Sequence, residues 1–273
     1  MSPLPPGEET LREVVQTLAP IERRAGSDGE RQAADWIAAR LTAAGCPAQV
    51  EAEEFRDGYA RVMSLLSGAG ALAGLTALAA RRPMARRLAG GAAAAVTAAI
   101  ADDVSNGPRL ARRACAAPKT TWNVVGSCGD AGAQRTLVVF AHHDAATAGM
   151  IFDDRAQRWF GERFPGLLER KDTSLPLWWL VLGGPLLVAL GAGRARPAML
   201  AAGAAGSAIA AAAFEDVARG PVVPGANDNL AAVAVLVALA ELVAAQPLSG
   251  LRLLLVSCGA EEVLQGGIYG FAR

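Results

Sequence analysis

The chain has 273 residues, enough for one sizeable α/β domain or for two smaller ones. It carries 26 basic and 26 acidic residues, so its formal net charge is zero. Nucleic-acid binding usually depends on an excess of basic residues. This chain has no such excess, so we expect no nucleic-acid partner. The first 15 residues contain no basic stretch followed by an apolar run, so no signal peptide is predicted there.

Two amphipathic helices and a strand are predicted at the start of the chain. Residues 9–45 carry apolar side chains at helical spacing in two blocks, with a turn at "RAGSDGE" between them. Ser27 and Glu30 fit a capping box at the start of the second helix, and Gly45 is a suitable stop. The alternating residues 47–55 predict a strand.

Four uncharged apolar segments follow in two pairs: residues 63–80 with 88–100, and residues 174–193 with 197–214. Each pair, joined by an arginine-containing turn, predicts a helical hairpin. A helix needs about 20 apolar residues to cross a bilayer, and three of the four segments reach or approach that length. Small-residue helices packed on a soluble core are the alternative. The run "LWWLVLGGPLLVAL" has no polar face, which favours membrane insertion.

We therefore expect a multi-pass membrane protein that contacts lipid, with its four apolar helices packed as one bundle. Arginines flank both ends of the first hairpin, so the positive-inside rule leaves the topology open. The side of the membrane that carries the rest of the chain and the oligomeric state are left open as well.

Outside the hairpins, residues 121–127, 135–141 and 250–258 predict buried strands, and residues 228–245 predict a long apolar helix. Strands alternating with helices predict an α/β three-layer sandwich, with a largely parallel or mixed sheet flanked by helices. The predicted sandwich comprises residues 1–62, 104–173 and 215–273. The two hairpins, residues 63–103 and 174–214, are insertions into it.

Three polar clusters follow predicted strands or precede the long helix. In "AHHDA", successive side chains alternate, so His142 and Asp144 share a face while His143 points away. Histidine ligands of metals commonly donate their second ring N–H to a carboxylate, and Asp144 is well placed for this. By itself, each histidine could equally be a structural residue.

The second cluster is "PGANDN", where Gly225 permits a close backbone approach and Asp228 precedes the helix. Asp228 could be a simple N-cap. The third is "GAEE", where Glu261 and Glu262 point in different directions, so that one can bind a metal and the other can move a proton. A helix-start charge cluster is the alternative. All three clusters are expected at one edge of one sheet, which favours a common site.

In their order and content these motifs resemble those of the co-catalytic two-zinc aminopeptidases, whose relatives include glutamate carboxypeptidases and glutaminyl cyclases. The resemblance covers roughly residues 10–60, 120–148 and 221–273, including "WNVVG". It implies two Zn²⁺ ions. Carried over, His142 resembles a ligand of the first zinc, Asp144 its orienting carboxylate and Asp228 the carboxylate that bridges both ions. Glu262 resembles a ligand of the second zinc, and Glu261 the general base.

The resemblance implies a zinc exopeptidase, most simply an aminopeptidase that hydrolyses N-terminal peptide bonds of a peptide substrate with a water activated by the metal. The family supplies one more aspartate and one more histidine to the zincs, and no motif here matches them. We therefore expect a fragment of a longer chain, or else a degenerate member. The alternatives are an inactive peptidase-like membrane or interaction protein, and a related carboxypeptidase or glutaminyl cyclase.

Overall fold

The computed structural model describes residues 7–168 and 178–273. They form two compact units, each built from separate stretches of the sequence. The sheet unit comprises Met1–Asp57, Ala117–Thr147 and Pro221–Arg273, and the helical unit comprises Gly58–Ala116 and Ala148–Gly220. The chain thus leaves the sheet unit twice and returns to it twice, and each excursion contributes two long helices to the helical unit.

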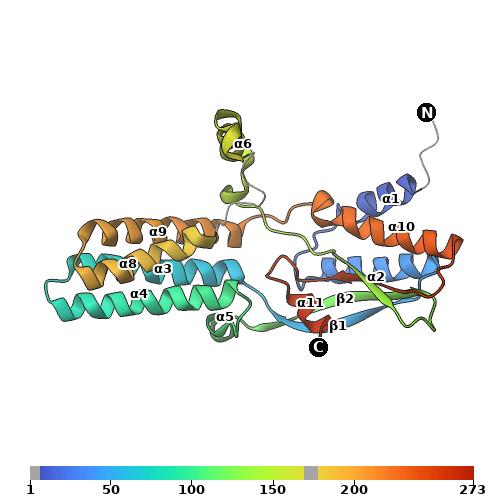
Figure 1. Cartoon of the computed structure of the whole chain (residues 1–273), viewed down its shortest axis with the longest axis horizontal. Helices are drawn as coiled ribbons and strands as arrows, with labels where there is room; N and C mark the ends of the chain where they lie inside the picture. The colour runs from blue at the N-terminus through green and yellow to red at the C-terminus, as the bar shows by residue number, and fades with distance from the viewer. Residues whose placement is uncertain (1–6, 169–177) are drawn as a thin grey trace. The chain divides into compact units, whose positions relative to one another are not determined.

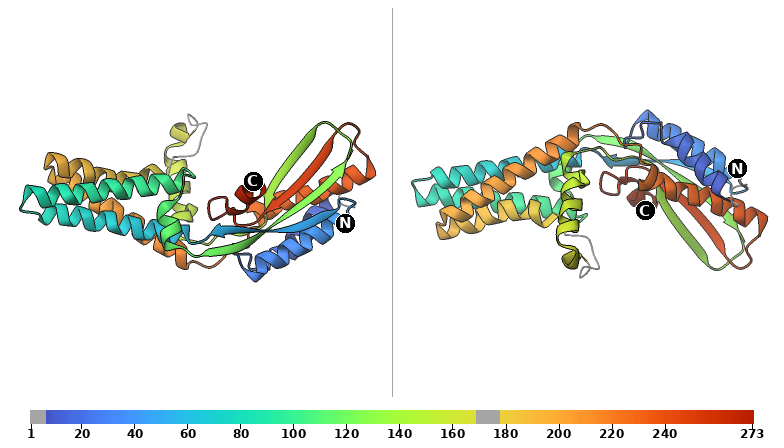
Figure 2. Two further views of the ribbon diagram at one scale, coloured as in Figure 1. Left: turned by 90° about the horizontal axis from the view of Figure 1, so that it is seen from below. Right: turned by 90° about the horizontal axis from the view of Figure 1, so that it is seen from above.

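One mixed sheet organises the sheet unit. Its strands lie in the order β1 (Ala48–Arg56), β2 (Pro118–Gly129), β4 (Arg252–Cys258) and β3 (Thr136–His142). β2 is antiparallel to both of its neighbours, whereas β3 and β4 are parallel. The predicted α/β class with a mixed sheet is confirmed, but parallel pairing among the described strands is limited to β3 and β4. β4 separates β3 from β2, its neighbour in sequence. Figure 1 labels β1 and β2, and the left view of Figure 2 shows the red β4 between the two green strands.

Helices cover both faces of this sheet. On one face α2 (Asp28–Ala43) packs on β1 and β2, while α10 (Ala231–Ala245) packs on β3 and β4 and against α1 (Glu8–Leu18). Their apolar faces and Leu255 of β4 share one buried core. Phe140 of β3 lies beside Val256 and so points to the other face. There it meets Phe271 of the short helix α11 (Gly266–Phe271), with ring centroids 5.4 Å apart.

Two predicted local signals are confirmed at the ends of α2. The Ser27 side chain accepts a hydrogen bond from the Glu30 backbone N–H at 3.2 Å, as a capping box requires. Gly45 follows the last turn with φ 85°, a left-handed conformation that suits glycine. The Ser27 cap fixes where α2 begins and so places Glu30 in its first turn, and Gly45 marks where the helix ends.

The helical unit is a bundle of four helices: α3 (Tyr59–Ala79), α4 (Pro83–Val104), α8 (Trp178–Arg194) and α9 (Pro197–Arg219). α3 packs against α4 and α9, and α8 packs against the same two helices, so the predicted single bundle is confirmed (Figure 2). α4 is longer than the predicted residues 88–100. Its final turn carries Asp103, which is buried in an ion pair with Arg112 of α5 (Leu110–Cys115).

Small residues make the close contacts between the helices of this bundle, and many of its large apolar residues face outward. Gly74 and Ala204 meet between α3 and α9, and Gly184 meets Ser207 between α8 and α9. Leu72, at 66% exposure, is one of a set of outward-facing large side chains; the set includes Leu65, Leu75, Leu88, Leu180 and Ile209. Met63, Ile100 and Leu200 are buried, but a bundle in water would expose few large apolar side chains, so the many exposed here differ from the distribution expected in water.

Three helical stretches are long and apolar enough to cross a membrane by length and composition: Tyr59–Ala79, Pro197–Arg219 and Ala226–Ala245. The apolar helix Trp178–Arg194 is shorter. The third stretch contains α10, whose Val233, Leu236 and Val237 are buried in the core of the sheet unit. Its hydropathy therefore reflects a core helix, and the two stretches that remain belong to the bundle.

Candidate metal centre

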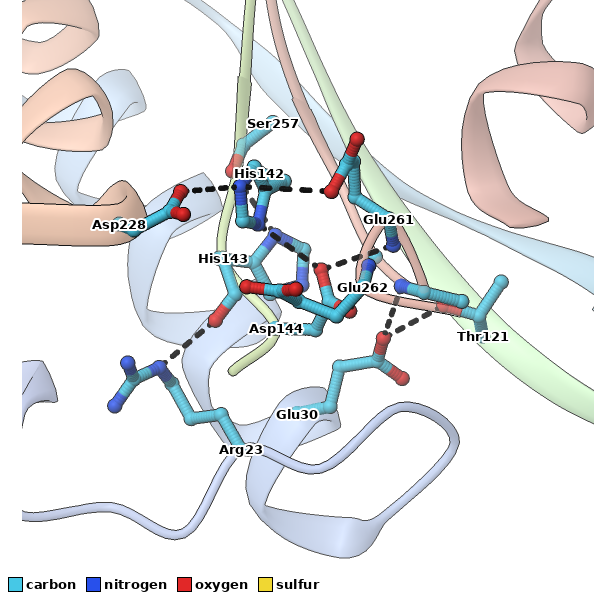
Figure 3. Close-up of polar contacts among 12 residues, drawn as sticks. Arg23, Glu30, Thr121, His142, His143, Asp144, Asp228, Ser257, Glu261 and Glu262 are labelled. Atoms are coloured by element: carbon cyan, nitrogen blue, oxygen red, sulfur yellow. Dashed lines mark hydrogen bonds and ion pairs between the residues drawn. The ribbon is translucent and has the colours of Figure 1, made fainter. Parts of the chain in front are cut away.

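The three predicted clusters converge at one edge of the sheet (Figure 3). His142 is the last residue of β3, and Glu261 and Glu262 lie in the loop after β4. Because β3 and β4 are parallel, their carboxyl ends meet at the same edge. Asp228 arrives from the irregular turn η2 (Ala226–Leu230) that precedes α10. The parallel β3–β4 pair is thus what brings the first and third clusters together.

Asp228 is not the N-cap of the long helix. α10 begins at Ala231, its N-cap position is Leu230, and no side chain caps it by a hydrogen bond. The backbone at Asp228 is non-helical, with φ −122° and ψ 93°. The predicted helix start at residue 228 is therefore wrong by three residues, and the side chain of Asp228 is left to point at His142.

The side chains of His142, Asp228 and Glu262 form a possible metal-binding group. One donor atom from each lies within 4.8 Å of the others. His142 Nε2 and Asp228 Oδ1 lie 3.1 Å apart. An imidazole nitrogen with two carboxylate oxygens is a donor set that suits zinc, and three protein ligands are the usual number at a catalytic zinc site. The side chains present therefore fit a zinc ion.

Asp144 connects the histidine cluster with the glutamate loop. Its Oδ1 lies 3.3 Å from His142 Nδ1 and accepts a hydrogen bond from the Glu261 backbone N–H at 3.0 Å. Its Oδ2 accepts from the Glu262 backbone N–H, also at 3.0 Å. The predicted contact with His142 is present. The sequence did not indicate the two hydrogen bonds that Asp144 accepts from the glutamate loop. Asp144 is fully buried.

His143 points away from this group, as strand alternation predicts. Its Nδ1 lies 2.9 Å from the Ser257 hydroxyl, and its carbonyl oxygen accepts from Arg23 Nε at 2.8 Å. Burial lowers the pKa of His143 to about 4, which keeps the ring neutral at physiological pH. His143 is therefore a core residue beside the site.

The site is strongly acidic. Burial opposes a charge on His142, but the carboxylates of Asp144, Glu261 and Glu262 outweigh it and raise the pKa of His142 to about 9. Burial, followed by the charge of Asp144, raises the pKa of Glu262 to about 7, and burial also raises the pKa of Glu261. Glu261 Oε2 lies 3.7 Å from His142 Nε2. Crowded carboxylates of this kind are stabilised when a cation binds among them.

Glu30 is a supporting residue that sequence reasoning treated only as a helix-capping signal. Its Oε1 accepts from the Thr121 hydroxyl at 2.7 Å and from the Ala260 backbone N–H at 2.8 Å, while Oε2 accepts from the Gly26 N–H at 2.8 Å. Glu30 therefore ties the start of α2 to β2 and to the loop that carries the two glutamates. No sequence feature marked this role, because it depends on the complete burial of Glu30, which is seen only in the folded chain.

Two close backbone approaches shape the site. Gly225 has φ 58°, and a Cβ there would lie 2.9 Å from Arg23 Nη2, in agreement with the predicted close approach. Gly259 lies so close to the side chains of Glu30 and Thr121 that a Cβ would overlap them. Asn123 supports the same turn by accepting from the Gly259 N–H at 3.2 Å.

No protein-family model and no curated protein matches the sequence. Among solved structures, the chain is similar to a leucine aminopeptidase precursor from Bacteroides thetaiotaomicron, with 11% identity, a TM-score of 0.46 and coverage of 97% of this chain and 51% of that one. It is also similar to a glutaminyl cyclase from the same organism, with 11% identity, a TM-score of 0.45 and coverage of 95% and 49%.

A third similar structure is an aminopeptidase from Aneurinibacillus sp. strain AM-1, with 13% identity, a TM-score of 0.44 and coverage of 96% of this chain and 64% of that one. The chain spans about half the length of the two Bacteroides structures. Aminopeptidases and glutaminyl cyclases are the classes that the sequence motifs resemble.

Proposed function

We propose that this chain is a zinc-dependent hydrolase of the aminopeptidase type, which removes N-terminal residues from peptides. One observation carries the proposal: donor atoms of His142, Asp228 and Glu262 lie within 4.8 Å of one another, with Glu261 beside them on the same loop. Separate elements of the chain supply these groups, and histidine and carboxylate ligands with an adjacent carboxylate suit hydrolysis by a zinc-activated water.

His142, Asp228 and Glu262 would hold the zinc. A zinc ion bound there supplies a Lewis acid that polarises the scissile carbonyl and lowers the pKa of a water molecule. Glu261 is the proposed general base, because its side chain is 37% exposed and thus open to substrate. It would accept the proton of the attacking water and pass it to the leaving amine. Asp144 would fix the orientation of both His142 and the glutamate loop.

The resemblance to two-zinc enzymes extends this proposal to a second zinc, with Asp228 as the bridging ligand. Asp228 suits that role because its side chain is 77% exposed and only one of its oxygens approaches His142 at 3.1 Å. A peptide with a free amino terminus is the proposed substrate class.

We further propose that the four-helix bundle anchors the protein in a membrane. The support is the set of large apolar side chains exposed on the bundle, together with the lengths of α3 and α9. Extraction of membranes from expressing cells tests this proposal. The chain should stay in the pellet after washes with salt and alkaline carbonate and dissolve only in detergent. Recovery in the aqueous phase without detergent would contradict membrane insertion.

The catalytic proposal is tested on the full chain in detergent, by zinc stoichiometry and by hydrolysis of aminoacyl anilides. The expected result is bound zinc and hydrolysis. Glu261→Gln should abolish hydrolysis and retain zinc, whereas His142→Ala should lose both. A matched control is Glu241→Gln, since Glu241 lies on α10 and pairs with Arg40, away from the site.

Other outcomes decide against the proposal. Cyclisation of glutaminyl peptides without anilide hydrolysis would replace it with a cyclase, and cleavage only at carboxyl termini would replace it with a carboxypeptidase. A chain that binds no zinc and hydrolyses nothing is an inactive membrane protein with a peptidase-like site. Two zinc ions per chain would support Asp228 as a bridge, and one would limit the site to His142, Asp228 and Glu262.

A further inference from the structure

Residues 150–164 of the helical unit expose a set of large apolar side chains. This segment contains the short helix η1 (Met150–Phe152), the helix α6 (Asp154–Arg163) and Phe164. Its exposed residues are Met150 at 77%, Ile151 at 42%, Phe152 at 56%, Trp159 at 63%, Phe160 at 37% and Phe164 at 41%. Six large apolar side chains, three of them phenylalanines and one a tryptophan, form an unusually apolar surface for a segment of this length.

The helical part of the segment is amphipathic. Arg155, Arg158 and Glu162 follow one another at intervals of three and four residues and therefore share one face of α6. Phe160 lies on the opposite side, and Trp159, four residues after Arg155, lies at the border between the two sides. The Phe160 ring meets the Phe164 ring with centroids 5.1 Å apart. A helix with one aromatic and one charged face is typical of a helix that lies in a membrane interface.

The segment is attached to the bundle at one end of α9. The Met150 backbone N–H donates to Asp216 Oδ2 at 2.6 Å, and Gly149 lies against Val217. At the same end of the bundle, Trp178 at the start of α8 stacks on Phe214 of α9 with ring centroids 5.8 Å apart. α6 then runs across this end of the bundle and not along it, in all the views of Figures 1 and 2. A helix that crosses the end of a membrane-spanning bundle lies along the membrane surface.

We propose that α6 is an interfacial helix that lies flat in the lipid headgroup region, with Trp159 and Phe160 directed into the bilayer. The proposal rests on the membrane insertion proposed above. A lipid surface is favoured over a protein partner because α8, whose first residue stacks on the same end of α9, also exposes large apolar side chains there. There Trp179 is 68% exposed and Leu180 is 73% exposed. Tryptophan at this level is the residue that membrane interfaces select.

Apolar burial, and not charge, holds the helix in this arrangement. Residues 150–164 contain three acidic and three basic side chains: Asp153, Asp154 and Glu162 against Arg155, Arg158 and Arg163. A neutral segment gains nothing overall from anionic lipids, so it should bind a zwitterionic bilayer. Phosphatidylcholine vesicles are therefore the appropriate probe.

The experiment uses the full chain with its four native cysteines replaced by serine, reconstituted in phosphatidylcholine vesicles. Single spin labels are placed by Trp159→Cys, Arg158→Cys and Leu72→Cys. Oxygen partitions into lipid, and a water-soluble nickel chelate does not. Labels at 159 and 72 should be relaxed mainly by oxygen, and the label at 158 should be relaxed mainly by the nickel chelate.

The label at position 72 separates the two proposals, because Leu72 faces outward from the bundle. If label 72 is relaxed by the nickel chelate, the bundle is not in lipid and the membrane proposal fails. If label 72 reports lipid while label 159 reports water, only the interfacial helix is wrong. If the label at 159 is immobile and neither reagent reaches it, Trp159 lies in a protein contact, and the proposal of an interfacial helix is wrong.

Discussion

Asp144 Oδ1 accepts a hydrogen bond from the backbone N–H of Glu261 at 3.0 Å, across 117 residues of sequence. The second oxygen of the same carboxylate accepts from the next N–H, that of Glu262, at the same distance. A fully buried carboxylate therefore determines where the proposed base and one proposed ligand stand. An asparagine at this position has one acceptor oxygen and places two N–H donors against a backbone donor.

Asp144→Asn should weaken zinc binding by about 10- to 100-fold, because the support of both His142 and the glutamate loop is damaged. Stability should fall by about 1–3 kcal/mol from the unsatisfied buried N–H. Zinc titration and thermal unfolding measure the two effects. Asp130→Asn is the matched control, since Asp130 also accepts from two backbone N–H groups, those of Gly132 and Gly250, at an exposed turn. Equal loss of zinc affinity in both variants would show that Asp144 has no special role.

The two adjacent histidines should respond to substitution in opposite ways. His142→Ala removes a proposed ligand and should abolish zinc binding. His143→Ala removes a fully buried ring and its contact with Ser257, and should lower stability by about 1–3 kcal/mol while zinc stoichiometry is kept. Mass spectrometry of the metal-loaded protein and thermal unfolding distinguish the two variants. Zinc loss in His143→Ala with retention in His142→Ala would reverse the assignment.

Glu30 should make stability depend on pH. Burial, followed by the charge of Asp144, raises its pKa from 4.5 to about 8 in the folded chain. The folded state therefore holds the proton more tightly than the unfolded state does. The stabilisation is complete below a pH of about 4.5 and is lost as the pH rises through about 8.

Glu30→Gln cannot titrate, and its amide oxygen can still accept from Thr121 and Ala260. The unfolding temperature of the natural chain should therefore fall more than that of the variant between about pH 5 and pH 8. Melting curves at a series of pH values test this expectation. A difference between the two proteins that stays constant with pH would mean that Glu30 is ionised throughout.

Close packing of α3 and α9 should depend on Gly74. A Cβ at this position would lie 2.7 Å from the Ala204 Cβ and 2.9 Å from Val188 Cγ2, so Gly74→Ala forces the helices apart. A loss of about 1–3 kcal/mol is expected. Gly68 on the same helix has no atom within 4 Å of such a Cβ, and Gly68→Ala should be neutral or stabilising by up to about 1 kcal/mol. Thermal unfolding in detergent compares the two variants, and equal effects would contradict the packing.

Several features of this protein followed from short stretches of sequence. The alternation of side chains along a strand placed His142 and Asp144 on one face and His143 on the other, and the spacing of Ser27 and Glu30 predicted the start of α2. The uncharged segments predicted the long helices of the bundle. These predictions succeeded because each depends on the geometry of a few consecutive residues, which periodicity reveals directly.

Other features depended on contacts between distant residues. Nothing local indicated that β4 lies between β2 and β3, or that β3 and β4 are the one parallel pair among the strands of the described residues. The sequence therefore predicted that His142, Asp228 and Glu262 share a site. Only the folded structure shows that their donor atoms lie within 4.8 Å of one another. The predicted helix start at Asp228 was also wrong. The backbone there is an irregular, non-helical turn that directs the Asp228 side chain toward the site.

The sequence by itself determined which residue types stand at the ends of strands and which segments are apolar enough for lipid. The tertiary structure alone decided which groups share a site. Glu30 is an example, because its carboxylate accepts a hydrogen bond from Ala260, which is far from it in the sequence. The physical reason is that strand order and helix packing are set by the burial of apolar surface summed over the whole unit. Strand order and helix packing therefore cannot be predicted from any single stretch of the chain.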